Sequence, residues 1–235
     1  MPAAATPATR PAPPRRARVR AADAERTPLT PDTWIEAATD VLVDQGIDHV
    51  RVDVLAGRLG VTRGSFYWHF RDREDLLRRV LAAWRERSTE QLTSRLERAH
   101  TDPRQQLHDV ITLPFRGRAA ARAARIELAI RAWARRDDMA RAAVDEADAS
   151  RIAYHVHLFA SIGFALPEAR SRAFLLYGYE VAESVLHRQG SEEQRRARAV
   201  LVEQLVQQPL AVAARAADAN APAEDASVSK PDAQR

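Results

Sequence analysis

The stretch that decides the fold runs from residue 55 to residue 70 and reads Leu55-Ala56-Gly57-Arg58-Leu59-Gly60-Val61-Thr62-Arg63-Gly64-Ser65-Phe66-Tyr67-Trp68-His69-Phe70. Apolar residues at helical spacing predict two short helices, over 52–59 and 63–70, joined by a turn at Gly60. A longer amphipathic helix precedes them. This order predicts a helix-turn-helix, whose second short helix can enter a DNA major groove.

The helix over 63–70 combines an apolar side with a basic and aromatic one. Phe66 and Phe70 lie one turn apart and should face inward, and Thr62 is placed to cap the first turn. Three Arg and no acidic residue fall between residues 58 and 71. The remaining side chains suit DNA: Arg63 can fork onto guanine or a phosphate, Gly64 admits close backbone approach, Ser65 can donate to a phosphate or base edge, and Tyr67 and His69 can reach backbone oxygens.

A less specific interpretation stays open for these residues. Helical hairpins with glycine turns are common, so the pattern is weak without its aromatic-His-Phe ending. Tyr67 and Trp68 are alternatively packing residues. Because neighbouring positions on a helix point about 100° apart and Phe66 and Phe70 fill the core side, at least one of the two should be exposed.

The segment resembles the DNA-binding part of the TetR family of transcriptional regulators, over roughly residues 30–80. The resemblance rests on residues 60–70, which end in Tyr-x-His-Phe, followed by the acidic-capped helix start Arg71-Asp72-Arg73-Glu74-Asp75-Leu76-Leu77. It implies a homodimer and an all-helical C-terminal domain that holds an inducer pocket. It also implies operator contacts through Thr62, Arg63, Ser65, Tyr67, Trp68 and His69, with Arg73 on a phosphate.

One position departs from the family pattern. Many members carry Ser or Thr as the cap of the helix that here spans 52–59, where this chain has Arg51. Arg51 could contact a phosphate directly. Loss of the side-chain cap leaves the start of that helix less well fixed.

Composition favours an all-α protein. Eight Gly in 235 residues, with many Ala, argue for helices over sheets, and the absence of Cys excludes disulfides, thiol catalysis and Cys-ligated zinc. Thr30-Pro31-Asp32 and Ser191-Glu192-Glu193-Gln194 predict two helix starts. We expect about nine helices, near residues 30–46, 52–59, 63–70, 72–99, 103–114, 119–136, 139–162, 167–187 and 191–208.

The chain divides into four predicted segments. A flexible Arg-, Pro- and Ala-rich arm over 1–28 carries a net charge of +4. A helix-turn-helix DNA-binding domain covers 29–79, a helical ligand-binding and dimerisation domain covers 80–208, and a flexible tail covers 209–235. The arm could follow a minor groove as homeodomain arms do, although solvated tails are commoner. Of the 36 basic residues only Lys230 is not Arg, which favours phosphate contacts or reflects a GC-rich genome.

The last two helices predict a dimer interface. The helix over 167–187 has two adjacent apolar stripes, which indicate two buried sides, one towards its own domain and one towards a twin subunit. The helix over 191–208 adds Ala197, Val200, Leu201 and Leu205 on one side, which would complete a four-helix interface. The alternative is that the helix over 167–187 is merely central in a larger bundle. The stripes are Phe174, Gly178, Val181 and Val185, and Leu175, Tyr179, Ala182 and Leu186.

A group of aromatic and histidine residues is the candidate effector pocket. Its members are Trp84, Trp133, Tyr154, His155, Phe159 and Tyr177. Plain core packing is the alternative, because aromatic residues at helical spacing more often fill a core. His155 and His157 diverge on a helix and cannot chelate one metal ion, so no metal site is expected.

These features predict a homodimeric repressor that a small-molecule effector releases from a pseudo-palindromic operator, with the helix over 72–99 as the lever. No catalytic residues, cofactor or membrane segment are expected, and the chain should be cytoplasmic. One alternative is a helical small-molecule enzyme with a purely structural helix-turn-helix. Another is a non-specific DNA-binding protein, which would want far more positive charge than the net +1 of residues 29–210.

Overall fold

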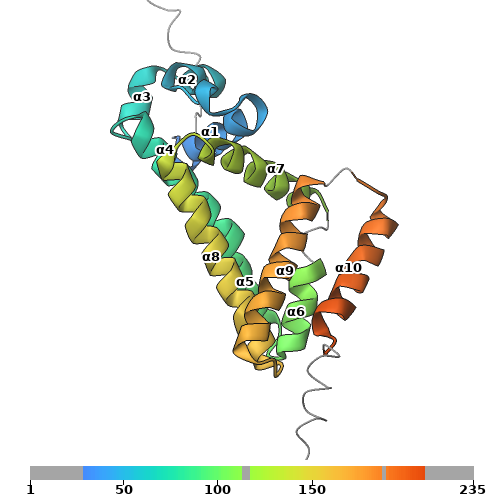
Figure 1. Ribbon diagram of the computed structural model, residues 1–235. Coiled ribbons are helices and arrows are strands. Elements are labelled where there is room, and N and C mark those ends of the chain that lie inside the picture. The colour runs from blue at the N-terminus through green and yellow to red at the C-terminus, as the bar shows by residue number, and fades with distance from the viewer. Residues whose placement is uncertain (1–28, 113–116, 187–188, 210–235) are drawn as a thin grey trace, which may run out of the picture.

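The structure is a computed structural model that describes residues 29–112, 117–186 and 189–209. These residues form helices and turns without a β-strand, so the all-α prediction is confirmed. The first four helices gather at one end of the molecule, and α8 runs from there beside α4 and α5 towards α6, α9 and α10 (Figure 1). The arm expected over 1–28 and the tail expected over 209–235 lie outside the described residues, apart from Pro209.

The helices begin and end close to the predicted positions. Three elements follow one another without interruption, so the helix expected over 72–99 is one rod with a π-helical turn inside it; counted so, the described residues contain nine rods and one short 3-10 turn. The elements are α1 Pro31–Gln45, the 3-10 turn η1 Ile47–His49, α2 Val52–Leu59, α3 Arg63–Tyr67, α4 Arg73–Arg85, the π-helical turn η2 Glu86–Glu90, α5 Gln91–Ala99, α6 Pro103–Thr112, α7 Gly117–Ala134, α8 Asp138–Ser161, α9 Leu166–Val185 and α10 Glu192–Gln207.

Local capping explains several helix starts. Thr30 and Ser191 each form a capping box, at the head of α1 and α10. The Asp72 side chain accepts from the Asp75 amide at 2.8 Å and so caps α4. These bonds satisfy amides that the first turn of a helix leaves unpaired.

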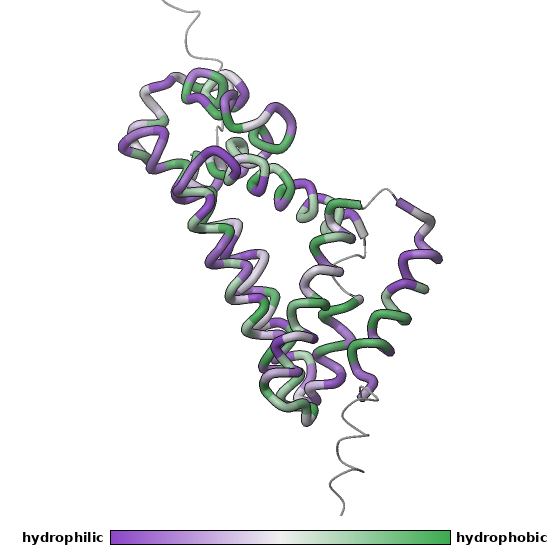
Figure 2. The backbone as a smooth tube through the Cα atoms, viewed as in Figure 1, coloured by the Kyte–Doolittle hydropathy of each residue, from purple (hydrophilic) through white to green (hydrophobic). Residues whose placement is uncertain are grey.

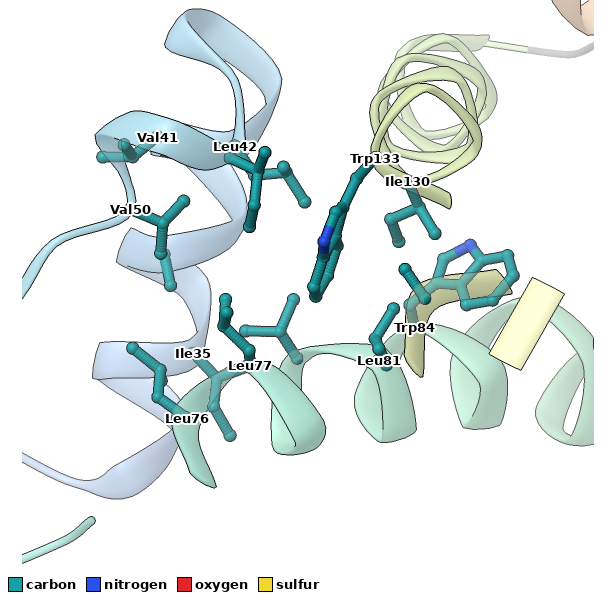
Figure 3. Close-up of a cluster of buried hydrophobic side chains, with 14 of the residues drawn as sticks. Ile35, Val41, Leu42, Val50, Leu76, Leu77, Leu81, Trp84, Ile130 and Trp133 are labelled. Carbon is teal, nitrogen blue, oxygen red and sulfur yellow. The ribbon is translucent and has the colours of Figure 1, made fainter. Parts of the chain in front are cut away.

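One apolar core holds the first four helices against α7 and α8. Trp34, Leu55 and Phe66 are fully buried in it. Figure 3 shows Trp133 of α7 pointing from the opposite side towards α1 and α4, beside Ile130. The core therefore includes residues on both sides of the domain boundary expected at residue 79. Within it, α7 packs against the helices of the helix-turn-helix domain.

A second core joins the other helices. It is built from buried residues of α5, α6, α8, α9 and α10, among them Leu96, Leu107, Phe159, Leu176 and Ala199. α8 and α9 pack along much of their length. Since α8 contributes to both cores, it links the two ends of the molecule.

Only one side of α9 is buried in this chain. Ala169, Ala173 and Leu176 face inward, whereas Phe174 and Leu175 are each 67% exposed. The two predicted stripes of α9 lie mostly on this exposed side. The inward positions are taken by Ala169, Arg172, Ala173, Leu176, Tyr177 and Glu183. Figure 2 shows apolar segments along both α9 and α10. We call the exposed set the α9–α10 outer face: Phe174, Leu175, Val185, Leu186, Val200, Leu201 and Leu205.

Candidate nucleic-acid interface

The helix-turn-helix is built as the sequence predicts. Leu55 and Ala56 of α2 are buried, and Gly60 ends that helix with φ of 66°, a left-handed conformation that glycine adopts without strain. Phe66 of α3 is buried and lies edge-on to Trp34, with ring centroids 5.4 Å apart. The apolar side of α3 therefore packs against α1, and the opposite side of α3 faces solvent.

The structure corrects two details of α3. The helix ends at Tyr67, not at Phe70, because residue 72 must be extended to start α4. The Phe70 amide still donates to the Phe66 carbonyl, and the two rings stack at 5.2 Å, so Phe70 stays in the core. Thr62 stands at the N-cap position, but its hydroxyl makes no capping bond; the Ser65 amide donates to the Thr62 carbonyl instead.

The outward side of α3 carries the predicted contact residues. Tyr67 is 62% exposed and Trp68 is 87% exposed, an unusual position for an indole ring. Arg63 is exposed and makes no hydrogen bond or ion pair with any described residue. Thr62 and Gly64 are also exposed, and Ser65 and His69 are partly buried. The structure thus brings seven of the nine predicted DNA-binding residues to one surface.

A shallow hollow of about 410 Å³ adjoins this surface, between the end of α3 and the side of α4. Arg79 lies over the Phe70 ring at 5.0 Å and pairs with Asp75. A hydrogen bond from the Arg71 amide, together with Arg79, lowers the pKa of Asp75, so that this carboxylate stays ionised beside the hollow. The hollow is lined by Tyr67, Trp68, His69, Phe70, Arg71, Asp75 and Arg79.

The two other predicted contacts, Arg51 and Arg73, already have partners within the chain. Arg51 binds Asp53 through Nε at 3.1 Å and Nη2 at 2.9 Å, and α2 begins without a side-chain cap, as the sequence departure predicts. Arg73 donates from Nε to the Val50 carbonyl at 2.6 Å and from Nη2 to the Ile47 carbonyl at 2.8 Å.

Sequence reasoning missed a row of ion pairs between α7 and α1. Arg122 binds Asp40 at 2.8 Å and Arg125 binds Asp44 at 2.9 Å. Asp40 also pairs with Arg58 of α2 at 3.3 Å, so one carboxylate touches both the helix-turn-helix and α7. The spacing of the two aspartates places them on one face of α1, but nothing in the sequence shows which helix covers that face.

The six predicted effector-pocket residues do not form one group. Trp133 lies in the core shared with α1 and α4, and Phe159 lies in the second core. His155 is buried between Tyr154 and Tyr177, with ring centroids 6.3 and 6.2 Å apart. Trp84 lies in the first core, but its Nε1 donates to Glu127 at 3.2 Å and the Arg151 guanidinium lies 5.6 Å from its indole centroid.

A polar network that sequence reasoning missed lies beside these rings. Arg151 of α8 donates to both oxygens of Glu127 on α7, at 3.1 and 3.2 Å. Arg131 binds the same carboxylate at 2.8 Å and both oxygens of Asp148, and Tyr177 of α9 also donates to Asp148. Two guanidinium groups thus face two carboxylates, so the network is electrically balanced.

The π-helical turn η2 joins this network to the rod of α4 and α5. Arg151 donates to the hydroxyl of Ser88 at 2.9 Å and to that of Thr89 at 3.2 Å. π-Helical turns are rare and frequently mark functional sites. Here the turn places two hydroxyl groups where α8 can bind them.

A buried histidine and carboxyl group adjoin the network between α8 and α9. His155 Nε2 lies 3.5 Å from Glu180 Oε1, and the buried Nδ1 atom has no hydrogen-bond partner among the described residues. Burial lowers the pKa of His155 to about 4 and raises the pKa of Glu180 to about 8. Both groups are therefore mainly uncharged near pH 7.

The described ranges contain neither a metal-binding cluster nor a helix that could span a membrane. They contain no cluster of three or more His, Cys, Asp or Glu residues arranged to hold a metal ion. None of the described helices combines the length and the apolar composition that crossing a membrane requires.

Comparison with known proteins agrees with the geometry of the first helices. Residues 35–80 match the family model described as bacterial regulatory proteins, tetR family. The HTH-type transcriptional regulator SrpR of Pseudomonas putida is 43% identical over 67 residues, which are 28% of this chain and 30% of SrpR. The class A tetracycline repressor protein from transposon 1721 of Escherichia coli is 47% identical over 51 residues, 22% of this chain and 24% of that repressor. The chain thus matches less than a third of the length of these two curated relatives.

Solved structures extend the likeness to most of the fold. A transcriptional regulator from Rhodococcus sp. RHA1 has a TM-score of 0.62 at 19% identity, over 76% of this chain and 96% of that one. The regulator FadR of Bacillus subtilis in complex with stearoyl-CoA has a TM-score of 0.56 at 17% identity, over 75% of this chain and 97% of that one. At these identities the likeness establishes the fold alone.

Proposed function

We propose that this chain, whose residues 35–80 match the model of the TetR family of bacterial regulatory proteins, is a homodimeric repressor of transcription. In this proposal each subunit inserts α3 into a major groove of a pseudo-palindromic operator. A small molecule that occupies the C-terminal helices releases the DNA.

The outward side of α3 is the observation that carries the proposal. Arg63 has all its donors free of described partners, and Tyr67 and Trp68 are exposed beside it although both are large and partly apolar. A guanidinium can bind guanine O6 and N7 together, and a phenol can donate to a phosphate. A surface of this composition suits the edge and backbone of a duplex better than it suits bulk water.

The proposed homodimer uses the α9–α10 outer face. That face gathers seven large apolar side chains that are about half exposed or more in the single chain. Exposed apolar patches of this kind mark interaction sites, and a twofold axis makes the same patch serve both subunits. A dimer closed through α9 and α10 would be a four-helix interface. It must place the two copies of α3 about 34 Å apart to reach successive major grooves.

The proposed effector site is the region where α7, α8 and α9 meet. The Nδ1 atom of His155, which has no hydrogen-bond partner among the described residues, and the rings of Tyr154 and Tyr177 supply polar and aromatic groups beside the polar network. A regulator of the same fold, FadR, is known in complex with stearoyl-CoA. An effector here need only favour a conformer in which the two copies of α3 no longer match the groove spacing.

Two helices are suited to transmit such a change. The rod of α4 and α5 connects directly to α3 through residues 68–72 and contacts the network at η2. α7 touches the same network through Glu127 and touches α1 through Arg122 and Arg125. In our proposal both helices carry the effector signal to the DNA-binding end.

Mobility-shift titration tests the DNA-binding proposal. With DNA from upstream of its own gene, the protein should give a defined retarded complex that unlabelled random DNA of equal length does not compete away. Equal affinity for both DNAs at moderate salt would discard sequence-specific regulation.

The homodimer is tested by sedimentation or light scattering. Leu201→Asp puts a charge into the α9–α10 outer face and should convert a dimer into monomers. Ala149→Asp adds the same charge at an exposed position of α8 and should leave the dimer intact. A wild-type monomer at micromolar concentration, or two variants of equal mass, would contradict this interface.

A further inference from the structure

Arg73 opens α4, yet its side chain reaches back to the loop between α1 and α2. Its Nε and Nη2 atoms donate to the carbonyls of Val50 and Ile47, which lie 23 and 26 residues earlier in the chain. Both distances, 2.6 and 2.8 Å, are those of strong charge-assisted hydrogen bonds. The guanidinium therefore bridges the start of α4 and the turn η1.

The loop that Arg73 holds leads directly into a helix start that lacks the usual support. α2 begins at Val52 without a side-chain cap, because Arg51 occupies the cap position and binds Asp53. The Val50 carbonyl, which Arg73 binds, is two residues before α2. The loop that enters this uncapped helix is held at the Val50 carbonyl by Arg73, next to the Arg51 amide, which donates to the His49 carbonyl at 2.8 Å.

We propose that Arg73 is a positioning residue that fixes the start of α2 to the start of α4, and thereby sets where α3 stands relative to the α4 rod. The expected effect on DNA binding rests on the proposed function, whereas the bonds from Arg73 to the loop do not depend on it. It differs from the phosphate contact that the family resemblance implies for Arg73.

The fork of the guanidinium is essential to this role. Arg73 uses two nitrogens to hold two carbonyls at once, and no described carboxylate pairs with it. A Lys ammonium keeps the charge but not the planar fork, so Arg73→Lys separates positioning from charge. A phosphate contact, by contrast, depends mainly on the charge.

Hydrogen exchange of the free protein is the first arm of the test. Arg73→Lys should speed amide exchange at the start of α2, in residues 52–56, at least tenfold, while Arg78→Lys on the same helix should leave it unchanged. Arg78 pairs with Glu74 on the surface and makes no bond to the loop. Unchanged exchange in a folded Arg73→Lys variant would overturn the proposal.

DNA binding is the second arm. Because misplacing α3 harms specific contacts more than general ones, Arg73→Lys should lower the ratio of operator affinity to random-DNA affinity about tenfold. A phosphate contact predicts instead that Arg73→Lys preserves this ratio, and that Arg73→Gln reduces the salt dependence of both affinities by about one ion; that pattern would overturn the proposal.

A measurement on the wild-type protein covers the case in which the variants do not fold. The Arg73 Nε–H resonance should be resolved and protected from exchange in the free protein and should keep its shift when operator DNA is added. A resonance that exchanges freely without DNA would contradict the proposal. If the wild-type protein shows no operator preference, the proposed function fails, while the exchange arm still decides the role of Arg73.

Discussion

Arg63 on α3 and Arg151 on α8 are the same residue type in opposite surroundings. Arg63 is exposed and has no partner among the described residues, whereas the Arg151 guanidinium donates to a carboxylate and three hydroxyl groups. Water satisfies the donors of the first, and the protein must satisfy those of the second. Arginine on α3 is therefore free to bind a ligand, and arginine in the interior serves the fold.

The comparison also explains why the number of arginines says little about function. This chain has 35 of them, and most described ones near the helix-turn-helix, such as Arg51, Arg58 and Arg73, are engaged by carboxylates or carbonyls. We propose that the absence of an internal partner, as at Arg63, marks a residue that contacts DNA.

The largest effect is expected from Glu127→Gln. It leaves the enclosed Arg151 without its carboxylate and weakens Arg131, so the free energy of unfolding should fall by about 3–5 kcal/mol. Denaturant unfolding followed by circular dichroism measures this. Glu36→Gln, at an exposed position of α1, should change stability by less than about 0.5 kcal/mol. Equal stability of the two variants would show that the network does not stabilise the fold.

Arg63→Ala should give the reverse pattern. Operator binding should weaken by about 1–3 kcal/mol because a base contact is lost, while unfolding stays as in the wild type. The control variant is Arg87→Ala, at an exposed position of η2. Both variants are titrated against operator DNA and random DNA. If the ratio of the two affinities does not change, Arg63 contacts a phosphate and not a base.

The pH dependence of stability tests the uncharged pair in the interior. Folded Glu180 keeps its proton up to about pH 8, but the unfolded chain releases it above about 4.5, so stability should fall as pH rises between these values. His155 opposes this fall only below its ordinary pKa of 6.5, because there the unfolded chain binds a proton that the folded chain does not. Between pH 7 and 8 the free energy of unfolding should fall by about 1 kcal/mol, less than the limit of about 1.4 kcal/mol per pH unit, because the folded carboxyl group itself begins to ionise near pH 8.

Glu180→Gln should remove that loss. The free energy of unfolding of the variant, measured at pH 7 and 8, should be nearly constant while that of the wild type declines. Parallel curves for the two proteins would mean that the Glu180 carboxyl group is ionised in the folded state.

The smallest effect is expected from Asp44→Asn. Its partner Arg125 is 56% exposed and Asp44 is 48% exposed, and exposed ion pairs contribute at most about 1 kcal/mol. Any difference in unfolding free energy from the wild type should vanish in 1 M salt, where charges are screened within about 3 Å. A loss of unfolding free energy that persists in 1 M salt would show that the ion pairs between α7 and α1 stabilise the fold by more than exposed charge pairing.

The sequence predicted the features that depend on neighbours along the chain. The caps at Thr30 and Ser191, the glycine turn at Gly60 and the inward faces of Phe66 and Phe70 all arise from residues within one or two turns. The same local geometry predicted that at least one of Tyr67 and Trp68 is exposed, and in the structure both are.

Contacts between distant segments were not predictable in this way. Trp133 was expected in an effector pocket, but α7 crosses α1 and places it in the core beside Leu42. Arg73 finds its two carbonyls 23 and 26 residues away, and Glu127 pairs with Arg151 24 residues away, in elements whose packing depends on the whole fold. Whether the Tyr154, His155 and Tyr177 group binds an effector stays a prediction.

Selection of bound fragments from a pool of random duplexes tests the central claim most directly, because the operator sequence emerges from the selection itself. The account predicts enrichment of one sequence made of two half-sites related by a twofold axis, with centres about one helical turn or a multiple of it apart, and loss of that enrichment with Arg63→Ala. Recovery of fragments without a common sequence from the wild-type protein would contradict it.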